Sequence, residues 1–170
     1  MEFPQNQEIW RAVDGYINYE VSSHGRIRNS TNGKILKTQK RNEYERVGIR
    51  NDEGKTKMIT VHRFVAEAFV PNPENKKFVD HINKDRNNNF YQNLRWATHA
   101  ENMRNKEMYK KNKTGLKGVH FRKGRFFACI RKDGTLKHIG YFDNKEDAAR
   151  AYDKKAKELF GEFATLNFED

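Results

Sequence analysis

Residues 79–102 read VDHINKDRNNNFYQNLRWATHAEN. The apolar, β-prone pair at 78–79 is followed by the polar, asparagine-rich segment 80–89, whose composition is typical of a loop. Apolar character returns at 93–96, which predicts a second short strand. The segment therefore predicts two short strands joined by a polar loop.

A helix is predicted directly after this unit. Thr98 followed by Glu101 is a capping-box sequence, because the threonine oxygen can accept from the backbone at position 101 and the glutamate can reach back. We expect the helix to begin at Thr98 and to run toward Tyr109. The predicted order is strand, loop, strand and helix.

The adjacent residues Asp80 and His81 supply a hard oxygen ligand and a base side by side. Neighbouring side chains in a strand point to opposite faces, so one could meet a metal ion and the other a water molecule. One divalent ion and one neutral imidazole can activate water and stabilise a leaving oxygen in phosphodiester hydrolysis. An isolated Asp-His pair is common in loops, so only the surrounding pattern can favour catalysis.

That pattern resembles the HNH nuclease family, whose strand–loop–strand–helix unit surrounds one metal ion. The matching segments are 79–83, 93–96 and 101–102. They are most similar to the phage intron-encoded members, in which an Asp and a later Asn replace the metal-binding histidines of the toxin nucleases. The ordered set is more specific than any of its members.

The resemblance implies four roles. Asp80 and Asn102 would ligate the metal, and His81 would be the general base. Asn93 would hold the loop and orient His81 through hydrogen bonds. The implied cofactor is Mg²⁺, or another divalent cation such as Mn²⁺, because carboxylate and amide oxygens suit hard ions.

Each residue also has a simpler interpretation. Asn93 could cap a turn, and Asn102 could be solvated in the first helical turn. The asparagine run 87–89 is expected to form a turn and is assigned no chemistry. His99 lies three residues before Asn102, so it could contact phosphate or the metal.

The part that precedes this unit predicts short strands joined by turns. The expected strands cover residues 19–21, 26–28, 34–36, 46–50 and 58–61. Apolar and basic residues alternate in 46–50, so one face can pack while the other meets phosphate. A short helix is expected at 62–69, ended by Pro71. Residues 10–28 resemble the small motif that precedes HNH centres in phage nucleases.

The last part of the chain predicts a sheet and a helix. The expected strands cover residues 118–121, 125–131 and 136–141. Asn144 is expected to cap a helix that runs to Phe160, with Gly161 just past its end. Alanines that recur at helical spacing would let this helix lie close to the sheet.

Residues 118–168 resemble the plant APETALA2/ethylene-response (AP2/ERF) DNA-binding domain, with matches at 124–126 and 139–142 among others. The resemblance implies a three-stranded sheet in the DNA major groove with a helix behind it. The plant pattern has Trp where this chain has Lys123 and His138. A base preference different from that of the plant domains is therefore expected.

Strand alternation independently divides this sheet into two faces. Phe126, Ala128 and Ile130 would face the helix. The first strand would turn Val119 and Phe121 to the core. Arginine can pair with guanine and an aromatic ring can touch a thymine methyl, whereas phosphate contacts fix register without reading sequence. The residues expected to contact DNA are His120, Arg122, Lys123, Arg125, Phe127, Arg131, Lys137 and His138.

The charge of the chain also points to nucleic acid. Its 170 residues carry 34 Lys and Arg against 23 Asp and Glu, a formal charge of +11. Residues 103–140 hold twelve basic and two acidic residues, a local charge of +10. Such a stretch could also be a solvated surface. The single Cys129 excludes an intramolecular disulfide, and no segment resembles a bilayer span.

Together these patterns predict an α+β fold of small modules, because a hydrophobic share of 35% suits thin cores. We expect a β-rich DNA-contacting module at 1–60, a ββα-metal HNH core at 61–112 and an AP2/ERF-like domain at 115–168. The modules contain an N-terminal β-rich part, the nuclease hairpin and helix, and a three-stranded antiparallel sheet with a helix.

The expected function is a homing-type endonuclease that recognises a sequence in double-stranded DNA and nicks it, with one metal and a histidine base. We expect a monomer with no membrane or protein partner, encoded by a phage and located in the cytoplasm of a bacterial host. Two alternatives stay open: a non-catalytic DNA-binding transcriptional regulator that retains the HNH scaffold, and an RNA-binding protein.

Overall fold

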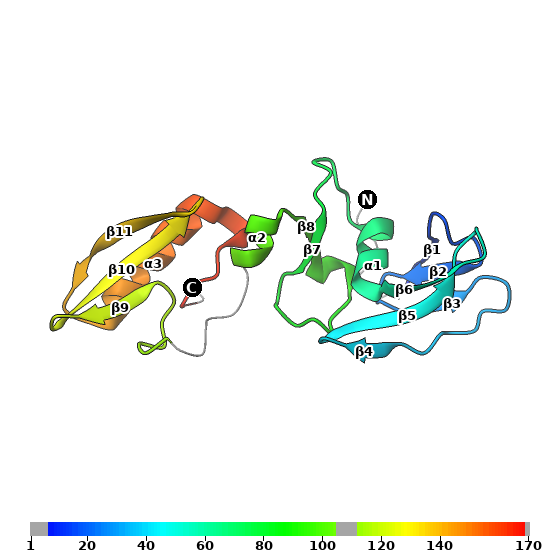
Figure 1. Cartoon of the computed structure of the whole chain (residues 1–170), viewed down its shortest axis with the longest axis horizontal. Coiled ribbons are helices and arrows are strands. Elements are labelled where there is room, and N and C mark those ends of the chain that lie inside the picture. The colour runs from blue at the N-terminus through cyan, green and yellow to red at the C-terminus, as the bar shows by residue number, and fades with distance from the viewer. Residues whose placement is uncertain (1–6, 105–111, 169–170) are drawn as a thin grey trace. The chain divides into compact units, whose positions relative to one another are not determined.

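The computed structural model describes residues 7–104 and 112–168. The chain forms two compact units, Met1–His99 and Ala100–Asp170. Each combines small antiparallel sheets or hairpins with few helices (Figure 1). The predicted α+β class is therefore confirmed. No helix in the described ranges has the length and apolar character needed to cross a membrane.

Unit 1 contains two three-stranded sheets, in the orders β1-β2-β3 and β4-β5-β6, and the hairpin β7-β8. All of its strand pairs are antiparallel. Its strands are β1 (Trp10–Ala12), β2 (Tyr19–Ser22), β3 (Ile27–Asn29), β4 (Gln39–Arg41), β5 (Tyr44–Arg50), β6 (Thr56–Thr60), β7 (Phe78–His81) and β8 (Leu94–Ala97).

The helix α1 (Val61–Phe69) lies between the β7–β8 hairpin and the two sheets (Figure 1). It buries Phe64 and Val65 and contacts β2, β5, β6, β7 and β8. The short 3₁₀ helix η1 (Tyr91–Asn93) leads into β8. The helix predicted at 62–69 is thus present.

One core serves the whole of unit 1. It includes Val21 from β2, Val47 and Ile49 from β5, Phe64 from α1 and Leu94 from β8. The alternation predicted for β5 is confirmed, because Val47 and Ile49 are buried while Gly48 and Arg50 are exposed. The module boundary predicted at residue 60 falls inside this unit and stays a prediction.

Unit 2 contains the sheet β11-β10-β9 and the helix α3, which packs against all three strands. Small side chains on α3, including Ala148 and Ala156, pack against Val119, Ala128 and Ile130. The helix begins where Asn144 Oδ1 accepts from the backbone N–H of Asp147 at 2.7 Å, as predicted. The short helix α2 (His99–Arg104) begins at the boundary between the units. The other elements of unit 2 are β9 (Val119–Arg122), β10 (Arg125–Lys132), β11 (Thr135–Phe142), α3 (Lys145–Phe160) and η2 (Gly161–Phe163).

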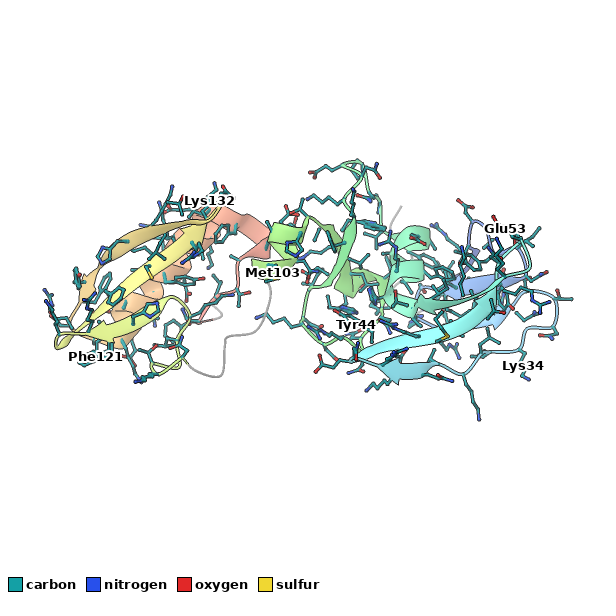
Figure 2. The ribbon with its side chains drawn as sticks, viewed as in Figure 1. Lys34, Tyr44, Glu53, Met103, Phe121 and Lys132 are labelled. Carbon is teal, nitrogen blue, oxygen red and sulfur yellow. The ribbon has the colours of Figure 1, made fainter. Side chains whose placement is uncertain are left out.

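Two expectations about local structure are corrected. Ile35 forms only an isolated bridge with Arg28, so residues 34–36 are not a strand. Phe121, labelled in Figure 2, is 59% exposed and is not a core residue of β9. It lies near the strand end, and its ring is tilted by 53° against that of Phe126, with ring centroids 4.8 Å apart.

Candidate active site

The β7–β8 hairpin carries the predicted acid and base at the end of β7. Asp80 pairs with Arg95 and His81 with Leu94 across the two strands. Both Asp80 and His81 are buried. Because adjacent strand residues point to opposite faces, the two side chains meet different surroundings.

The carboxylate of Asp80 forms a buried ion pair with Arg95. Asp80 Oδ2 accepts from Nε at 2.9 Å and from Nη2 at 2.8 Å, and the side chains are 6% and 10% exposed. Charge-assisted hydrogen bonds of this kind fix the orientation of a carboxylate. Arg95 belongs to the sequence segment that resembles the HNH family, but the resemblance implied no role for it.

The imidazole of His81 forms a hydrogen bond with the side chain of Asn89. His81 Nε2 lies 3.2 Å from Asn89 Oδ1. Burial lowers the pKa of His81 below its ordinary value, opposed by the hydrogen bond with Asn89 and the charge of Asp80. A lowered pKa keeps the ring neutral near neutral pH, which is the form that can accept a proton.

Asn93 fastens both ends of the loop that follows β7. Its Oδ1 accepts from the backbone N–H of Asn83 at 3.0 Å, and its Nδ2 donates to the carbonyl of Asn88 at 2.8 Å. Its backbone carbonyl accepts from the N–H of Ile82 at 2.8 Å. These are loop-holding contacts. A side-chain hydrogen bond to the His81 ring is made by Asn89, to which the sequence gave only a turn-forming role.

Two further side chains on the His81 side of the hairpin were missed. The ring of His62, in the first turn of α1, meets that of His81 edgewise with centroids 5.1 Å apart. Tyr44, at the start of β5 and labelled in Figure 2, lies 4.9 Å from His62 between ring centroids. Burial lowers the pKa of His62 to about 4, and its Nδ1 is buried without a hydrogen-bond partner. No local sequence signal marks these contacts, because they join segments far apart in the chain.

The fourth predicted residue, Asn102, lies in α2 (His99–Arg104) and belongs to unit 2. Asp80 belongs to unit 1, so the metal site that would join them stays a prediction. The predicted helix continues beyond Arg104 only into residues that the structure does not describe. Within the described ranges, no three His, Cys, Asp or Glu side chains gather as a metal site. A carboxylate and an amide oxygen nevertheless fit the preferences of Mg²⁺.

The outer face of the β9–β11 sheet carries a row of aromatic rings. His120 and His138 both stack on Phe127, with centroids 5.0 and 5.9 Å away. Tyr141 adjoins His138 at 4.7 Å. This row lies opposite the core positions Ala128 and Ile130, as strand alternation predicted.

The predicted basic residues of this sheet lie on its strands and turns. Arg122 and Arg125 face each other across β9 and β10, and Arg125 also pairs with Asp143 at 3.0 Å. Lys123 occupies the turn between them with a φ of 51°. Arg131 lies on β10 and Lys137 on β11. Their contact with DNA stays a prediction.

Comparison with known protein families matches two parts of unit 1 and the helix α2. A profile described as HNH endonuclease matches residues 60–104, and the NUMOD4 motif matches residues 8–50. Both matched ranges end before the C-terminal sheet. The likeness of that sheet to AP2/ERF domains therefore stays a prediction.

Individual relatives agree with these matches. An uncharacterized HNH endonuclease, L247 of Acanthamoeba polyphaga mimivirus, is 38% identical over 58% of this chain and 26% of its own length. The DNA endonuclease I-HmuI of Bacillus phage SP01 is 38% identical over 56% of this chain and 56% of its own. The chain thus spans from about a quarter to somewhat over half of the curated relatives it matches.

A solved structure extends the likeness beyond the hairpin. The structure described as DNA binding and cleavage by the HNH homing endonuclease I-HmuI has a TM-score of 0.53 and 28% identity to this chain. The match covers 89% of this chain and 88% of the other. The chain therefore carries a NUMOD4 motif followed by an HNH endonuclease domain, and it is homologous to the phage homing endonuclease I-HmuI.

Proposed function

We propose that this protein is a homing-type endonuclease that hydrolyses a phosphodiester bond of double-stranded DNA and nicks one strand. One observation carries the proposal: a buried histidine with a lowered pKa follows a buried, Arg-paired aspartate on a hairpin whose loop Asn93 fastens. Homology to a DNA endonuclease supports the same chemistry.

His81 is the general base. Its neutral imidazole accepts a proton from the attacking water, and the adjacent charge of Asp80 stabilises the imidazolium that forms. Burial of the ring strengthens both interactions, because charges act more strongly where water is excluded. One base per chain accounts for one cut strand.

Asp80 and Asn102 would hold Mg²⁺. When bound, the ion supplies Lewis-acid stabilisation of the charge on the leaving oxygen. Arg95 fixes the direction of the Asp80 carboxylate through two hydrogen bonds to Oδ2. Asn93 keeps the loop closed, so that the base stays on the same side of the hairpin.

The outer face of the β9–β11 sheet reads the DNA. Its aromatic row can contact bases, while Arg122, Arg125 and Arg131 can reach base edges or phosphates. The concentration of positive charge in residues 103–140 supports this role. A sheet that fits the B-form major groove should discriminate against duplex RNA.

The test is nicking of supercoiled plasmid DNA by the full chain with Mg²⁺. Wild type should convert supercoiled to open-circular DNA, and His81→Ala should lower the rate by at least about 100-fold while DNA binding persists. Glu53→Gln is the matched control, because Glu53 forms only an exposed surface pair with Lys55. Circular dichroism verifies that each variant is folded.

Two outcomes would contradict the proposal. If wild type and His81→Ala are equally inert although both bind DNA, the protein is a DNA-binding regulator that retains the scaffold. If unlabelled duplex RNA displaces labelled DNA as well as duplex DNA does, the binding surface does not select the B-form groove.

A further inference from the structure

The side chain of Asn89 lies between two residues that are far apart in the sequence. Its Oδ1 is 3.2 Å from His81 Nε2, and its Nδ2 donates to Glu45 Oε2 at 3.1 Å. Asn89 is 4% exposed, its contact with His81 is buried, and its contact with Glu45 is partly buried. Glu45 comes from β5, 44 positions earlier in the chain. A carboxylate, an amide and an imidazole thus form one line of hydrogen bonds.

The donors and acceptors along this line can be arranged in only one way. An ionised carboxylate accepts hydrogen bonds and donates none, so the amide nitrogen of Asn89 must face Glu45. The amide oxygen then faces His81, and the ring must donate to it from Nε2. A neutral imidazole carries one N–H, so the lone pair of His81 is on Nδ1.

The position of Asn89 is fixed by the turn between β2 and β3. Gly25, at a φ of +86°, lies so close that an added Cβ would be 2.6 Å from the Cβ of Asn89. The neighbouring Ser23 carbonyl accepts from the N–H of Tyr91 at 2.9 Å. The first sheet therefore holds the backbone on which the amide is mounted.

We propose that Glu45 and Asn89 are positioning residues that fix the tautomer of His81, with the proton on Nε2 and Nδ1 as the atom that accepts the proton from water. The proposal rests on the proposed function, because it assigns His81 as the base. Its consequence is that β5, outside the nuclease hairpin, sets which nitrogen of the base is reactive.

The first experiment reads the tautomer without any reaction. ¹⁵N NMR of the full chain, labelled in histidine and kept free of divalent metal, distinguishes the two neutral forms of the ring. At a pH well above the ordinary imidazole value of about 6.5, His81 should show a protonated Nε2 and an unprotonated Nδ1. A protonated Nδ1 in wild type would overturn the proposal.

The second experiment uses two variants that keep the shapes of the side chains. In Glu45→Gln, residue 45 can accept or donate, so the amide of Asn89 can point either way and His81 should become a mixture of tautomers. In Glu45→Gln combined with Asn89→Asp, residue 89 can only accept. The double variant should therefore restore a single Nε2-protonated form. A Glu45→Gln protein that keeps the single wild-type tautomer would contradict the relay.

Turnover supplies the functional readout. Asn89→Ala removes the contact to the ring and should lower the nicking rate by about 10- to 100-fold, as for other residues that orient reactive groups. DNA affinity should be unchanged. Asn87→Ala is the matched control, because Asn87 lies in the same asparagine run but is exposed, and its side-chain amide donates to Asp85 Oδ1 at 3.0 Å. Equal rates for the Asn89 and Asn87 variants would refute a positioning role.

The two proposals fail separately. If the wild type does not nick plasmid DNA, the endonuclease proposal is refuted. The tautomer of His81 measured by NMR still tests the Glu45–Asn89–His81 relay. A nicking wild type with the opposite tautomer sinks the relay and leaves the endonuclease in place.

Discussion

Replacing Gly25 by alanine should lower the stability of the fold and disturb the tautomer of His81, because this glycine lies against Asn89. Its φ of +86° is a conformation that residues with a side chain adopt at a cost of about 1–2 kcal/mol. The added Cβ would also lie 2.6 Å from Asn89 Cβ and 3.3 Å from its carbonyl oxygen. Relieving an overlap of this kind typically costs about 1–3 kcal/mol. The free energy of unfolding should therefore fall by about 2–5 kcal/mol.

Gly15 offers a matched control in the same unit. It has a similar φ of +79°, and an added Cβ would meet nothing within 4 Å. Gly15→Ala should therefore show the backbone cost of about 1–2 kcal/mol alone. The difference between the two variants isolates the contact with Asn89, and we expect it to be about 1–3 kcal/mol.

The assay is urea unfolding of both variants at one pH, with the free energy extrapolated to water. The Gly25 variant should also show a mixed tautomer for His81, because its alanine displaces the amide that selects Nε2. Equal unfolding free energies for the two variants, together with an unchanged tautomer, would refute the view that the first sheet holds the base.

Three other expectations concern charge. Burial lowers the pKa of His62 from 6.5 to about 4, so the folded protein binds fewer protons than the unfolded chain, and stability should decrease as pH falls through this window. The loss between pH of about 7 and about 5 should be about 2 kcal/mol; urea unfolding of His62→Gln should show a shallower pH dependence, and an unchanged one would contradict the assignment. Asp80→Asn removes the carboxylate that faces the buried Arg95, and should lower the unfolding free energy by about 3–5 kcal/mol. Glu53→Gln, at an exposed pair, should change it by less than about 1 kcal/mol, and equal losses would show that the buried pair is not special. If about six Lys or Arg residues meet phosphate, the slope of log affinity against log salt should be about −5, measured by fluorescence anisotropy on duplex DNA; a flat line would exclude the basic stretch.

Local patterns predicted most of the helices and strands. The alternation of Val47 and Ile49 and the capping position of Asn144 depend only on a few neighbouring residues. They could therefore be predicted from the sequence. β4 was missed because Gln39–Arg41 is exposed throughout and has no apolar pattern. The prediction that Phe121 is a core residue was wrong. Phe121 lies near the end of a strand, where α3 does not need to cover the sheet.

The residues of the candidate site likewise include some that the sequence could predict and some that it could not. Asp80 and His81 could be proposed from a local motif, since the two residues are adjacent in the chain. Glu45 and Asn89 could not, because their contact depends on a fold that brings positions 44 residues apart together. Within the run 87–89, nothing in the sequence distinguishes the buried asparagine from its more exposed neighbours.

The shared core of unit 1 limits which segments of this chain can be moved between genes. A recombination event that moved only residues 60–104 into another gene would carry Phe64 and Leu94 away from Val21 and Val47, which cover them here. The transplanted hairpin would expose apolar side chains to water, inviting aggregation. A graft that keeps these side chains covered must therefore also include the strands that precede α1.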